Sequence, residues 1–367
     1  MQIYEQAPEL AEFGAGINIS PNSVKFFQAV GLADKLHAIS AEPVGLSWRD
    51  WSAEDISYSL QFGDFEKRYG AKYYVVHRSD LHRLLSEAVP QASIHLGKRC
   101  TRLESRNGSV GLSFADGSSA EADVAVGCDG IRSAVRACLF GGEGPRYVGT
   151  MCWRALAPSA ALPKDYHDRY VNQWSGDGGF VVSYYIRQGQ FINFVAVRQQ
   201  PGWTETSWSV PSSVDEMLAA FPDAGTRLRR MMAAATSCSK WGQFTGEHAP
   251  HWTKGLVTLL GDAAHAMLAT FGQGANMAFE DAYVLAQWLH ARADDPEAAL
   301  AGYEAARKPR ATKVQQLSRT EVHFKKQHSN WDRLRREFVF LTRHGTTTSG
   351  VYRWIFGYDP VTQWRGS

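Results

Sequence analysis

The sequence lacks several features, and each absence excludes a class of protein. Its 367 residues contain no run of about 18 or more apolar residues, so no helix is expected to span a membrane. The 39 basic residues nearly balance the 37 acidic ones, which gives no general reason to bind nucleic acid or an anionic membrane. The first ten residues, MQIYEQAPEL, have neither a basic nor an apolar stretch, so no signal peptide is expected.

Cysteine is scarce as well. The chain has 5 cysteines, widely spaced and without a Cys-x-x-Cys pair, which excludes a zinc ribbon or a thioredoxin-type motif, and no metal site is predicted. Scattered cysteines in a chain of this length are typical of small, reduced core residues, and Cys128 in particular is expected to be buried in a strand. The predicted location of the protein is therefore the cytoplasm.

The residues that are present favour a folded chain of more than one domain. An apolar content of 44% excludes a disordered chain, and the length exceeds that of one compact domain. Two short apolar segments are predicted to be strands: residues 121–130, which end in Asp129-Gly130, and residues 255–262, which end in Gly261-Asp262. Both strands end abruptly in an acidic residue beside a glycine.

Further patterns predict a hairpin and two helical regions. Segments 180–186 and 191–197 flank four turn-forming residues, which indicates an antiparallel hairpin. A helix is expected from about Gly274, and its apolar stripe is formed by Ala278, Ala282, Leu285 and Leu289. Residues 297–345 follow an Asp-Pro helix start and look helical and highly charged, with residues 333–336 forming a solvated face.

The most informative feature is the string that follows the second of these strands. It reads GDAAH over residues 261–265, GQGAN over residues 272–276, and Glu280-Asp281. An Asp at the carboxyl end of a parallel strand lies at the ligand-binding edge of an α/β sheet, where it can accept hydrogen bonds from ribose hydroxyls. The glycines allow close approach of the backbone, and the following helix directs its N–H groups at a phosphate or an anionic flavin ring. Gly261-Asp262 alone would fit an ordinary tight turn, but the whole string favours a nucleotide site.

The complete string resembles the flavin-binding motif of the class A aromatic hydroxylases, which are FAD-dependent monooxygenases of the para-hydroxybenzoate hydroxylase fold. It is most similar to the salicylate hydroxylase and 6-hydroxynicotinate monooxygenase branch. Further segments match the same family and extend the resemblance over essentially the whole chain: residues 14–18, 21–22, 77–81, 128–136 and 354–359.

The resemblance implies a fold and a division into domains. The fold is α/β (α+β with interleaved domains): a Rossmann-like FAD/NAD(P)-binding domain, a β-sheet substrate domain and C-terminal helices. Residues 1–149 form the first part of the FAD-binding domain, with a substrate-domain insertion near 42–75. Residues 150–240 form the β-rich substrate domain, residues 241–295 the second part of the FAD-binding domain, and residues 296–367 the C-terminal helices.

The resemblance also implies the site residues. It assigns cofactor binding to Glu5, Arg78, Cys100, Asp129, Gly130, Gly261, Asp262, Gly272, Gly274, Ala275 and Asn276. It places Asn18, Phe180, Tyr184 and Ala269 in the substrate pocket, and it makes Tyr184 and His265 the catalytic candidates. A histidine in this context more often holds the loop beside the flavin than transfers a proton. The aromatic residues of the β-rich block are expected to line the pocket, or alternatively to form an ordinary sheet core: Trp153, Trp174, Phe180, Tyr184 and Phe194.

The implied activity is the hydroxylation of a small phenolic, hydroxybenzoate-like or hydroxypyridine-like substrate with FAD, O2 and NADH or NADPH. Ionisation of the ring hydroxyl would raise the nucleophilicity of its ortho and para carbons, and the cofactor supplies the hard chemistry. Halogenases, epoxidases and oxidases share the fold and remain alternatives. A plain NAD-dependent dehydrogenase fits least. No nucleic acid and no membrane span are expected as partners, and a homodimer is left open.

The sequence departs from the family pattern at three places. The family begins with a strand and a Gly-x-Gly-x-x-Gly loop about 20–30 residues before the ribose-binding acid, whereas here that acid is Glu5. Ala269 replaces a proline, and Phe180 replaces a histidine assigned to substrate or proton handling. Two readings stay open: a normal enzyme whose chain starts late, or a degenerate relative that does not bind FAD stably and is inactive.

Overall fold

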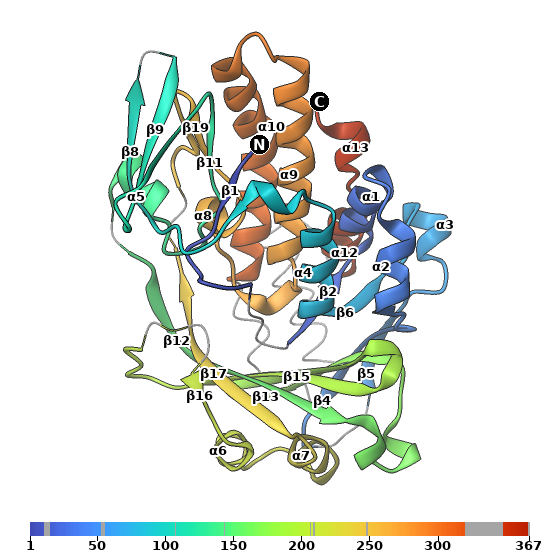
Figure 1. The fold of residues 1–367 in the computed structure, drawn as a ribbon. Coiled ribbons are helices and arrows are strands. Elements are labelled where there is room, and N and C mark those ends of the chain that lie inside the picture. Colours follow the sequence, from blue (N-terminus) through green and yellow to red (C-terminus); the bar gives the residue numbers. More distant parts are fainter. Residues whose placement is uncertain are drawn as a thin grey trace.

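The computed structural model describes residues 1–10, 15–52, 56–106, 108–142, 144–205, 207, 210–246, 249–319 and 348–365. Figure 1 shows one large sheet with two short helices below it and most of the remaining helices above it. The elements form a mixed α/β architecture, as the sequence predicts.

The large sheet has eight strands in the order β16-β17-β12-β15-β14-β13-β4-β5. Their bounds are β16 Val210–Pro211, β17 Ser237–Thr245, β12 Arg146–Pro158, β15 Phe191–Gln199, β14 Gly179–Ile186, β13 Tyr170–Gly176, β4 Gly45–Asp50 and β5 Ile56–Gln61. All neighbours are antiparallel except β13 and β4. The predicted hairpin is confirmed as β14 and β15, which pair antiparallel.

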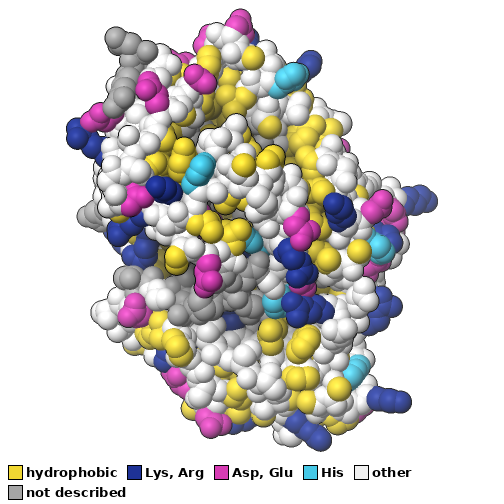
Figure 2. Space-filling model, viewed as in Figure 1, with side chains coloured by type: hydrophobic (Ala, Val, Ile, Leu, Met, Phe, Trp, Pro, Cys, Tyr) yellow, Lys and Arg dark blue, Asp and Glu magenta, His cyan; other side chains and the backbone are white. Residues whose placement is uncertain are grey.

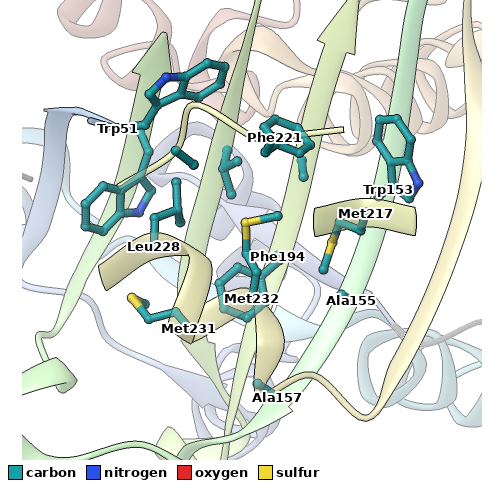
Figure 3. Packing of buried hydrophobic residues seen from close by; sticks show 14 of the residues in the cluster. Trp51, Trp153, Ala155, Ala157, Phe194, Met217, Phe221, Leu228, Met231 and Met232 are labelled. Atoms are coloured by element: carbon teal, nitrogen blue, oxygen red, sulfur yellow. The ribbon is translucent and has the colours of Figure 1, made fainter. Parts of the chain in front are cut away.

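One face of this sheet packs against α6 (Val214–Ala219) and α7 (Thr226–Ala233). The interface is a cluster of large buried side chains, and Figure 3 shows Trp153 and Phe194 of the sheet beside Phe221, Leu228 and Met232. Trp174 belongs to the same cluster. Of the two alternatives for Trp153, Trp174 and Phe194, the ordinary sheet core therefore holds and the lining of the substrate pocket does not, because strand alternation turns them to the face that α6 and α7 cover.

The opposite face of the sheet, here called the site face, carries Phe180 and Tyr184. Tyr184 packs in a cluster with Phe271 and with α12 (Thr348–Phe356). Phe180 packs with Cys152, Val197 and Trp241. The site face thus looks toward the segments that contain the glycine-rich string, which lie above the sheet in Figure 1.

The parallel strands β11 (Ala125–Gly127) and β19 (Val257–Leu259) confirm the two predicted strands that end in an Asp. The strand β18 (Thr253–Lys254) extends this sheet, and β1 (Ile3–Tyr4) pairs separately with β7 (Ile94–His95). The helices that follow the second Asp are α8 (Asp262–His265), α9 (Gly274–Ala291) and α10 (Pro296–Ser318), and α9 and α10 lie side by side in Figure 1.

The remaining elements surround these sheets. One small sheet contains β2 (Gly16–Ile19), β6 (Tyr74–His77) and β3 (Ser40–Ala41), and another contains β10 (Ser119–Ala122), β9 (Ser109–Phe114) and β8 (Cys100–Arg106). The other helices are α1 (Pro21–Ala29), α2 (Ala33–Ile39), α3 (Phe65–Tyr69), α4 (Arg78–Glu87), α5 (Ala134–Phe140) and α13 (Pro360–Gln363). Acidic and basic side chains are interspersed on the face shown in Figure 2.

Two details of the helices differ from the sequence prediction. Of the four residues predicted to form the apolar stripe of α9, only Leu285 is fully buried. The buried face contains Glu280 and Asp281 instead, because arginines of α10 neutralise them. Residues 333–336 lie outside the described part of the chain, whereas the predicted charged helix is present as α10.

The cysteine prediction is also only partly right. All 5 cysteines are free, but Cys128 and Cys138 are exposed and only Cys152 is fully buried. Cys128 is exposed because β11 ends at Gly127, so the residue lies in the loop beyond the strand. Within the described ranges, no helix is both long and apolar enough to cross a membrane, and no cluster of His, Cys, Asp and Glu is suited to a metal ion.

Candidate active site

Asp262 lies three residues after the end of β19 and beside the N-terminus of α9. A Cβ placed on Gly274, the first residue of α9, would lie 3.9 Å from Asp262 Oδ1. Gly261 has φ +63°, and a Cβ there would approach the Ala278 Cβ to 3.3 Å, so the turn packs directly on the helix. Burial raises the pKa of the Asp262 carboxyl, and the attraction of His265 and Arg78 opposes this rise. The first-turn N–H groups of α9 and this carboxylate therefore meet at one point.

Asn276 joins the glycine-rich loop to β2. Its Nδ2 donates to the carbonyls of Asn18 and Gly272 at 2.9 and 2.8 Å, and its Oδ1 accepts from the Ser20 N–H at 3.0 Å. Gly272 has φ +62°, and a Cβ there would meet Asn18 Nδ2 at 2.8 Å. Asn18 Oδ1 is buried and has no hydrogen-bond partner among the described residues. A buried acceptor of this kind is costly unless a ligand satisfies it.

Tyr184 on the site face lies against the start of β2. The Gly16 N–H donates to Asn193 Oδ1 at 2.7 Å. A Cβ on Gly16 would lie 2.5 Å from Tyr184 Cε2 and 2.8 Å from Asn193 Cγ, so only a glycine permits this approach. Burial raises the pKa of Tyr184 well above its usual value, although nearby Arg154 partly offsets the effect. The phenol is therefore protonated at neutral pH and can donate a hydrogen bond.

His265 is held by a buried carboxylate rather than exposed to the site. It is 2% exposed, and its Nε2 lies 2.5 Å from Asp281 Oδ2. The same oxygen accepts the Gly261 N–H at 3.3 Å, while Arg307 Nε donates to Asp281 Oδ1 at 2.7 Å. Burial opposes ionisation of Asp281, but His265 and Arg307 prevail and hold the pKa of its carboxyl below the usual value. Asp281 therefore ties His265 to the turn that presents Asp262.

A second buried carboxylate, Glu280, is connected through Arg310 to the C-terminal segment of the chain. Arg310 donates to both of its oxygens at 2.8 Å, and Asn22 Nδ2 donates at 2.7 Å. The Arg310 guanidinium lies between the rings of Trp354 and Tyr358, at 4.7 and 4.0 Å from their centroids. The C-terminal segment 354–359 thus packs on an ion pair that Asn22 connects to Gln273 of the glycine-rich loop, residues 272–276, here called the cofactor loop.

Asp129 and Gly130 lie at the N-terminus of α5. Asp129 Oδ2 accepts the Val135 N–H at 3.0 Å, and its Oδ1 accepts from Ser133 Oγ. Ser133 is the N-cap residue, and its Oγ accepts the Arg136 N–H at 2.8 Å. Gly130 has φ +77°, a conformation that favours glycine. Arg136 then links α5 to the GDAAH segment by donating to the Ala263 carbonyl at 3.1 Å.

Glu5 and Cys100 lie in separate surroundings. Glu5 follows β1 and its Oε1 accepts the Ala7 N–H at 2.8 Å. Cys100 begins β8, and burial raises the pKa of its thiol, an effect to which Asp129 adds. In the part of the chain that the structure describes, neither Glu5 nor Cys100 forms a hydrogen bond or an ion pair with Asp262. These two predicted cofactor residues are therefore not part of the group of contacts at the N-terminus of α9.

Arg78 begins α4, a helix whose first turn interacts both with the cofactor site and with the large sheet. Its side chain is exposed, its N–H donates to the Ala15 carbonyl at 2.7 Å, and its charge acts on Asp262. Two residues farther on, the buried Asp80 accepts from Arg187 at 2.9 and 3.1 Å. Arg187 belongs to the turn between β14 and β15, so this pair fixes the hairpin that carries Tyr184 against the helix that begins at Arg78.

Sequence reasoning missed several residues of this arrangement. Asn193, Arg307 and Arg310 are buried, and Arg154 is partly buried on the site face. A single charged residue inside the apolar strand 150–157 was a usable signal for Arg154. The two arginines of α10 lie in a segment predicted only to be helical and highly charged, and nothing in the local sequence distinguishes them from the other charged residues there. Ala269, which was predicted, lies exposed in a short 3-10 turn before Gly272.

Comparison with known proteins identifies the family. A family profile described as "FAD binding domain" matches residues 3–318, and the chain therefore belongs to this family. It is 38% identical to a 3-amino-4-hydroxybenzoate 2-monooxygenase of Streptomyces platensis over 97% of this chain and 89% of that protein. It is 34% identical to a 6-hydroxynicotinate 3-monooxygenase of Pseudomonas fluorescens, over 98% of this chain and 89% of that protein.

Solved structures agree with this assignment. A salicylate hydroxylase substrate complex matches with a TM-score of 0.81 at 27% identity, over 96% of this chain and 90% of that one. Klebsiella pneumoniae HpxO, complexed with FAD and uric acid, matches with a TM-score of 0.82 at 23% identity over 98% and 90%, which shows the fold. The predicted fold class is confirmed, and the chain is an FAD-dependent monooxygenase of the aromatic hydroxylase class that uses NAD(P)H as cosubstrate.

The residues around α9 fit FAD. The unpartnered Asn18 Oδ1 offers a buried acceptor, and the α9 N-terminus offers N–H donors beside the Asp262 carboxylate. A flavin nucleotide carries both hydroxyl groups that need acceptors and phosphates that need donors. Asp262, Gly272, Gly274 and Asn18 are thus the residues that would hold it, while Asn276 fixes their loop.

Proposed function

We propose that this protein hydroxylates a small aromatic ring that carries an ionisable hydroxyl, of the hydroxybenzoate or hydroxypyridine kind, with O2 as the second substrate. The observation that carries the proposal is the position of β2. Its first residue, Gly16, contacts Tyr184 of the site face, and two residues later Asn18 contacts Gly272 and Asn276 of the cofactor loop. A ring bound beside Tyr184 would therefore lie next to the cofactor. The named activities of the two relatives support this substrate class.

FAD, when bound, supplies the redox chemistry and the oxygen transfer. Tyr184 holds the substrate: its phenol stays protonated because burial raises its pKa, so it donates to the hydroxyl or oxyanion of the ring. Phe180, Val197 and Cys152 form an apolar patch on the same face that keeps water away from the ring. Phe180 cannot accept a proton, so the oxyanion is stabilised at Tyr184 without a neighbouring histidine.

His265 acts as a positioning residue in this proposal. Its Nε2 is engaged by Asp281, its ring is buried, and its backbone N–H bonds to the Gly261 carbonyl at 2.9 Å. These bonds hold the turn that presents Asp262 rather than offer a proton to the ring. A cytoplasmic location, a homodimer and the proposed domain boundaries stay predictions.

The first experiment is the visible spectrum of the purified protein after incubation with FAD. Flavin bands at about one equivalent are expected. NAD(P)H and O2 consumption should then rise on addition of 3-amino-4-hydroxybenzoate, 6-hydroxynicotinate or salicylate, with 18O from O2 in the product. Benzoate, which lacks the hydroxyl, is the matched control compound. A protein that stays colourless would support the degenerate relative instead.

The Asp262 assignment is tested in the same assay. Asp262→Ala should abolish flavin retention, because the carboxylate beside the α9 N-terminus is lost. Asp116→Asn, which alters an exposed ion pair with Lys98, is the control and should retain flavin fully. Unchanged flavin content in the Asp262 variant would refute the assignment.

A further inference from the structure

One ion pair joins the helix that begins beside the cofactor site to the hairpin that carries Tyr184. Arg187 Nε donates to Asp80 Oδ2 at 2.9 Å, and Arg187 Nη2 donates to Asp80 Oδ1 at 3.1 Å. Two parallel bonds of this kind fix the angle as well as the distance between the partners. The Asp80 side chain is only 9% exposed, so the carboxylate is shielded from water and the pair is stronger than an ordinary surface ion pair.

The turn at Arg187 has a backbone conformation that its own residues do not favour. Arg187 has φ +50° and Gln188 has φ +55°, and no other non-glycine residue that the structure describes has a positive φ. A residue with a Cβ is strained in this region, whereas glycine is not. Such strain persists only where the surrounding contacts impose the conformation. Those contacts include the bond of Arg187 to Asp80 and a bond from Gln188 Nε2 to the Ala38 carbonyl at 3.1 Å.

The strained turn lies directly beyond the strand that carries Tyr184. Because β14 ends just before Arg187, only two residues separate Arg187 from Tyr184. The Tyr184 ring also contacts Gly16, which lies opposite His77 where β2 pairs with β6. The segment 77–80 therefore holds the end of the hairpin at two points, through β2 on one side and through the ion pair on the other. Two points of attachment fix the orientation of Tyr184, whereas one would leave the hairpin free to pivot.

The same segment reaches the cofactor site. Arg78 begins α4, and its charge acts on Asp262. We propose that Asp80 and Arg187 are positioning residues of the hydroxylation: their bond holds Tyr184, and the ring bound to it, in place relative to the cofactor site. This inference rests on the proposed function, in which Tyr184 holds the substrate. Without the bond, the hairpin would move the substrate away from the cofactor, and O2 would be consumed without hydroxylation.

The test measures how much of the oxidised NAD(P)H yields hydroxylated product. The substrate is the one that the wild type turns over fastest among 3-amino-4-hydroxybenzoate, 6-hydroxynicotinate and salicylate. Product is quantified by chromatography, and a peroxide assay follows the competing reaction, in which NAD(P)H, a proton and O2 give NAD(P)+ and H2O2. Arg187→Gly should lower the product formed per NAD(P)H by at least about twofold and the kcat of product formation by about tenfold or more, because a misplacement of about 1 Å costs up to about 100-fold. The flavin content should stay unchanged.

Glycine is the decisive replacement for Arg187. It removes the ion pair but adopts φ +50° without strain, so the two effects on stability oppose each other and the urea midpoint should stay close to that of the wild type. A loss of coupling in a protein of unchanged stability separates a positioning role from a purely structural one. Gln188→Gly relieves the same kind of strain and keeps the ion pair, so it should retain the coupling of the wild type.

Two further variants address the carboxylate and its second partner. Asp80→Ala should reproduce the loss of Arg187→Gly, and the double variant should lose no more than either single variant, because both changes remove the same bond. Arg83→Ala is the matched control: Arg83 Nη2 donates to the same Asp80 Oδ1 at 3.2 Å, but from within α4, so this bond does not reach the hairpin. It should behave like the wild type. Arg187→Lys should restore part of the coupling, because it returns the charge without the planar fork.

The outcomes separate this inference from the proposed function. If the wild type turns over none of the three rings, the proposed function fails, and the inference fails with it. If Arg187→Gly and Asp80→Ala form as much product per NAD(P)H as the wild type, the proposed function stands and the inference is overturned. The inference is also overturned if Arg83→Ala loses coupling to the same extent, if the two single losses add in the double variant, or if flavin content falls in parallel with coupling.

Discussion

Gly16 determines how closely β2 can approach the large sheet. Its N–H bonds to Asn193 Oδ1, and the Tyr184 ring occupies the space where any side chain would begin. The same strand carries Asn18, whose carbonyl is held by Asn276. A single residue without a Cβ therefore sets the separation between Tyr184, which we propose to hold the substrate, and the loop that we propose to hold the cofactor.

Gly16→Ala should damage the site more than the fold. The new Cβ would lie 2.5 Å from Tyr184 Cε2 and 2.8 Å from Asn193 Cγ, so Tyr184 or β2 must shift. Overpacking of this kind costs about 1–3 kcal/mol of stability. Substrate-stimulated NAD(P)H oxidation should fall by at least tenfold, because a displaced Tyr184 loses one contact with the substrate. The flavin content should stay unchanged. Gly63→Ala, where a Cβ meets open space, is the control.

Tyr184→Phe should weaken substrate binding without altering flavin content. Loss of one hydrogen bond to a charged group costs about 1.5–3 kcal/mol, or about 10- to 150-fold in the KM of the substrate. Because burial raises the pKa of Tyr184, its ionisation should not appear in the pH–rate profile below the range of a free phenol. Tyr185→Phe changes the next residue, on the opposite face, and should behave like the wild type. Equal substrate KM and rate in Tyr184→Phe would remove Tyr184 from the site.

The sequence predicts single residues well where the backbone conformation of the site requires a particular residue type. Asp262, Gly272 and Gly274 follow from the demand of a nucleotide for a helix N-terminus and a positive φ. In the structure Gly272 has φ +62° and Gly274 lies beside Asp262, while their role in holding the cofactor stays a prediction. Trp153 and Phe194 could not be assigned to a face, because the sequence shows which residues are aromatic but not which side of the sheet faces the cofactor.

At the scale of the element, α9 and α10 are joined by charge and not by apolar packing alone. Arg307 is fully buried and lies 2.7 Å from oxygens of both Glu280 and Asp281. Hydrophobic periodicity correctly located α9 and placed Leu285 and Leu289 against the core, but it missed the buried Glu280 and Asp281 because it scores carboxylates as surface residues. Only the position of α10 in space shows that these carboxylates are neutralised.

Glu280→Gln should destabilise this helix pair strongly. Burial opposes ionisation of Glu280, but Arg310 and Arg307 prevail and hold the pKa of its carboxyl below 4.5, so it is charged at neutral pH. A folded-state pKa below the unfolded value contributes stability that is present above pH 4.5 and lost as pH falls through the folded pKa. Removing one partner of a buried pair costs about 3–5 kcal/mol.

Urea unfolding at pH 7 and at successively lower pH values measures this effect. The wild type should lose stability below pH 4.5, and Glu280→Gln should lose less over the same interval because the titrating group is absent. Glu297→Gln changes an exposed glutamate at the start of α10 and should stay within about 0.5 kcal/mol of the wild type. A Glu280→Gln protein as stable as this control at pH 7 would contradict the role of the network.

At the scale of the whole molecule, segments from four parts of the chain meet at the cofactor loop. Asn22 near the start, Glu280 in α9, Arg310 in α10 and Tyr358 near the end form one connected set. The resemblance at residues 354–359 was visible in the sequence, but its physical role was not. That role depends on Arg310, which lies 48 positions before Tyr358 and gains its partners only when the chain folds.

Tyr358→Leu should therefore affect the cofactor site from a distance. The ring lies 4.0 Å from the Arg310 guanidinium, and a desolvated cation–π contact contributes about 2 kcal/mol. Without it, the Arg310–Glu280 pair gains access to water, and the loop that Asn22 and Asn276 hold becomes less ordered. The dissociation constant of FAD, measured by fluorescence titration, should rise by about tenfold, and the urea midpoint should fall. Tyr358→Phe keeps the ring over Arg310 and should restore both values. If Tyr358→Leu binds FAD as tightly as Tyr358→Phe, the end of the chain stabilises the fold without supporting the cofactor loop.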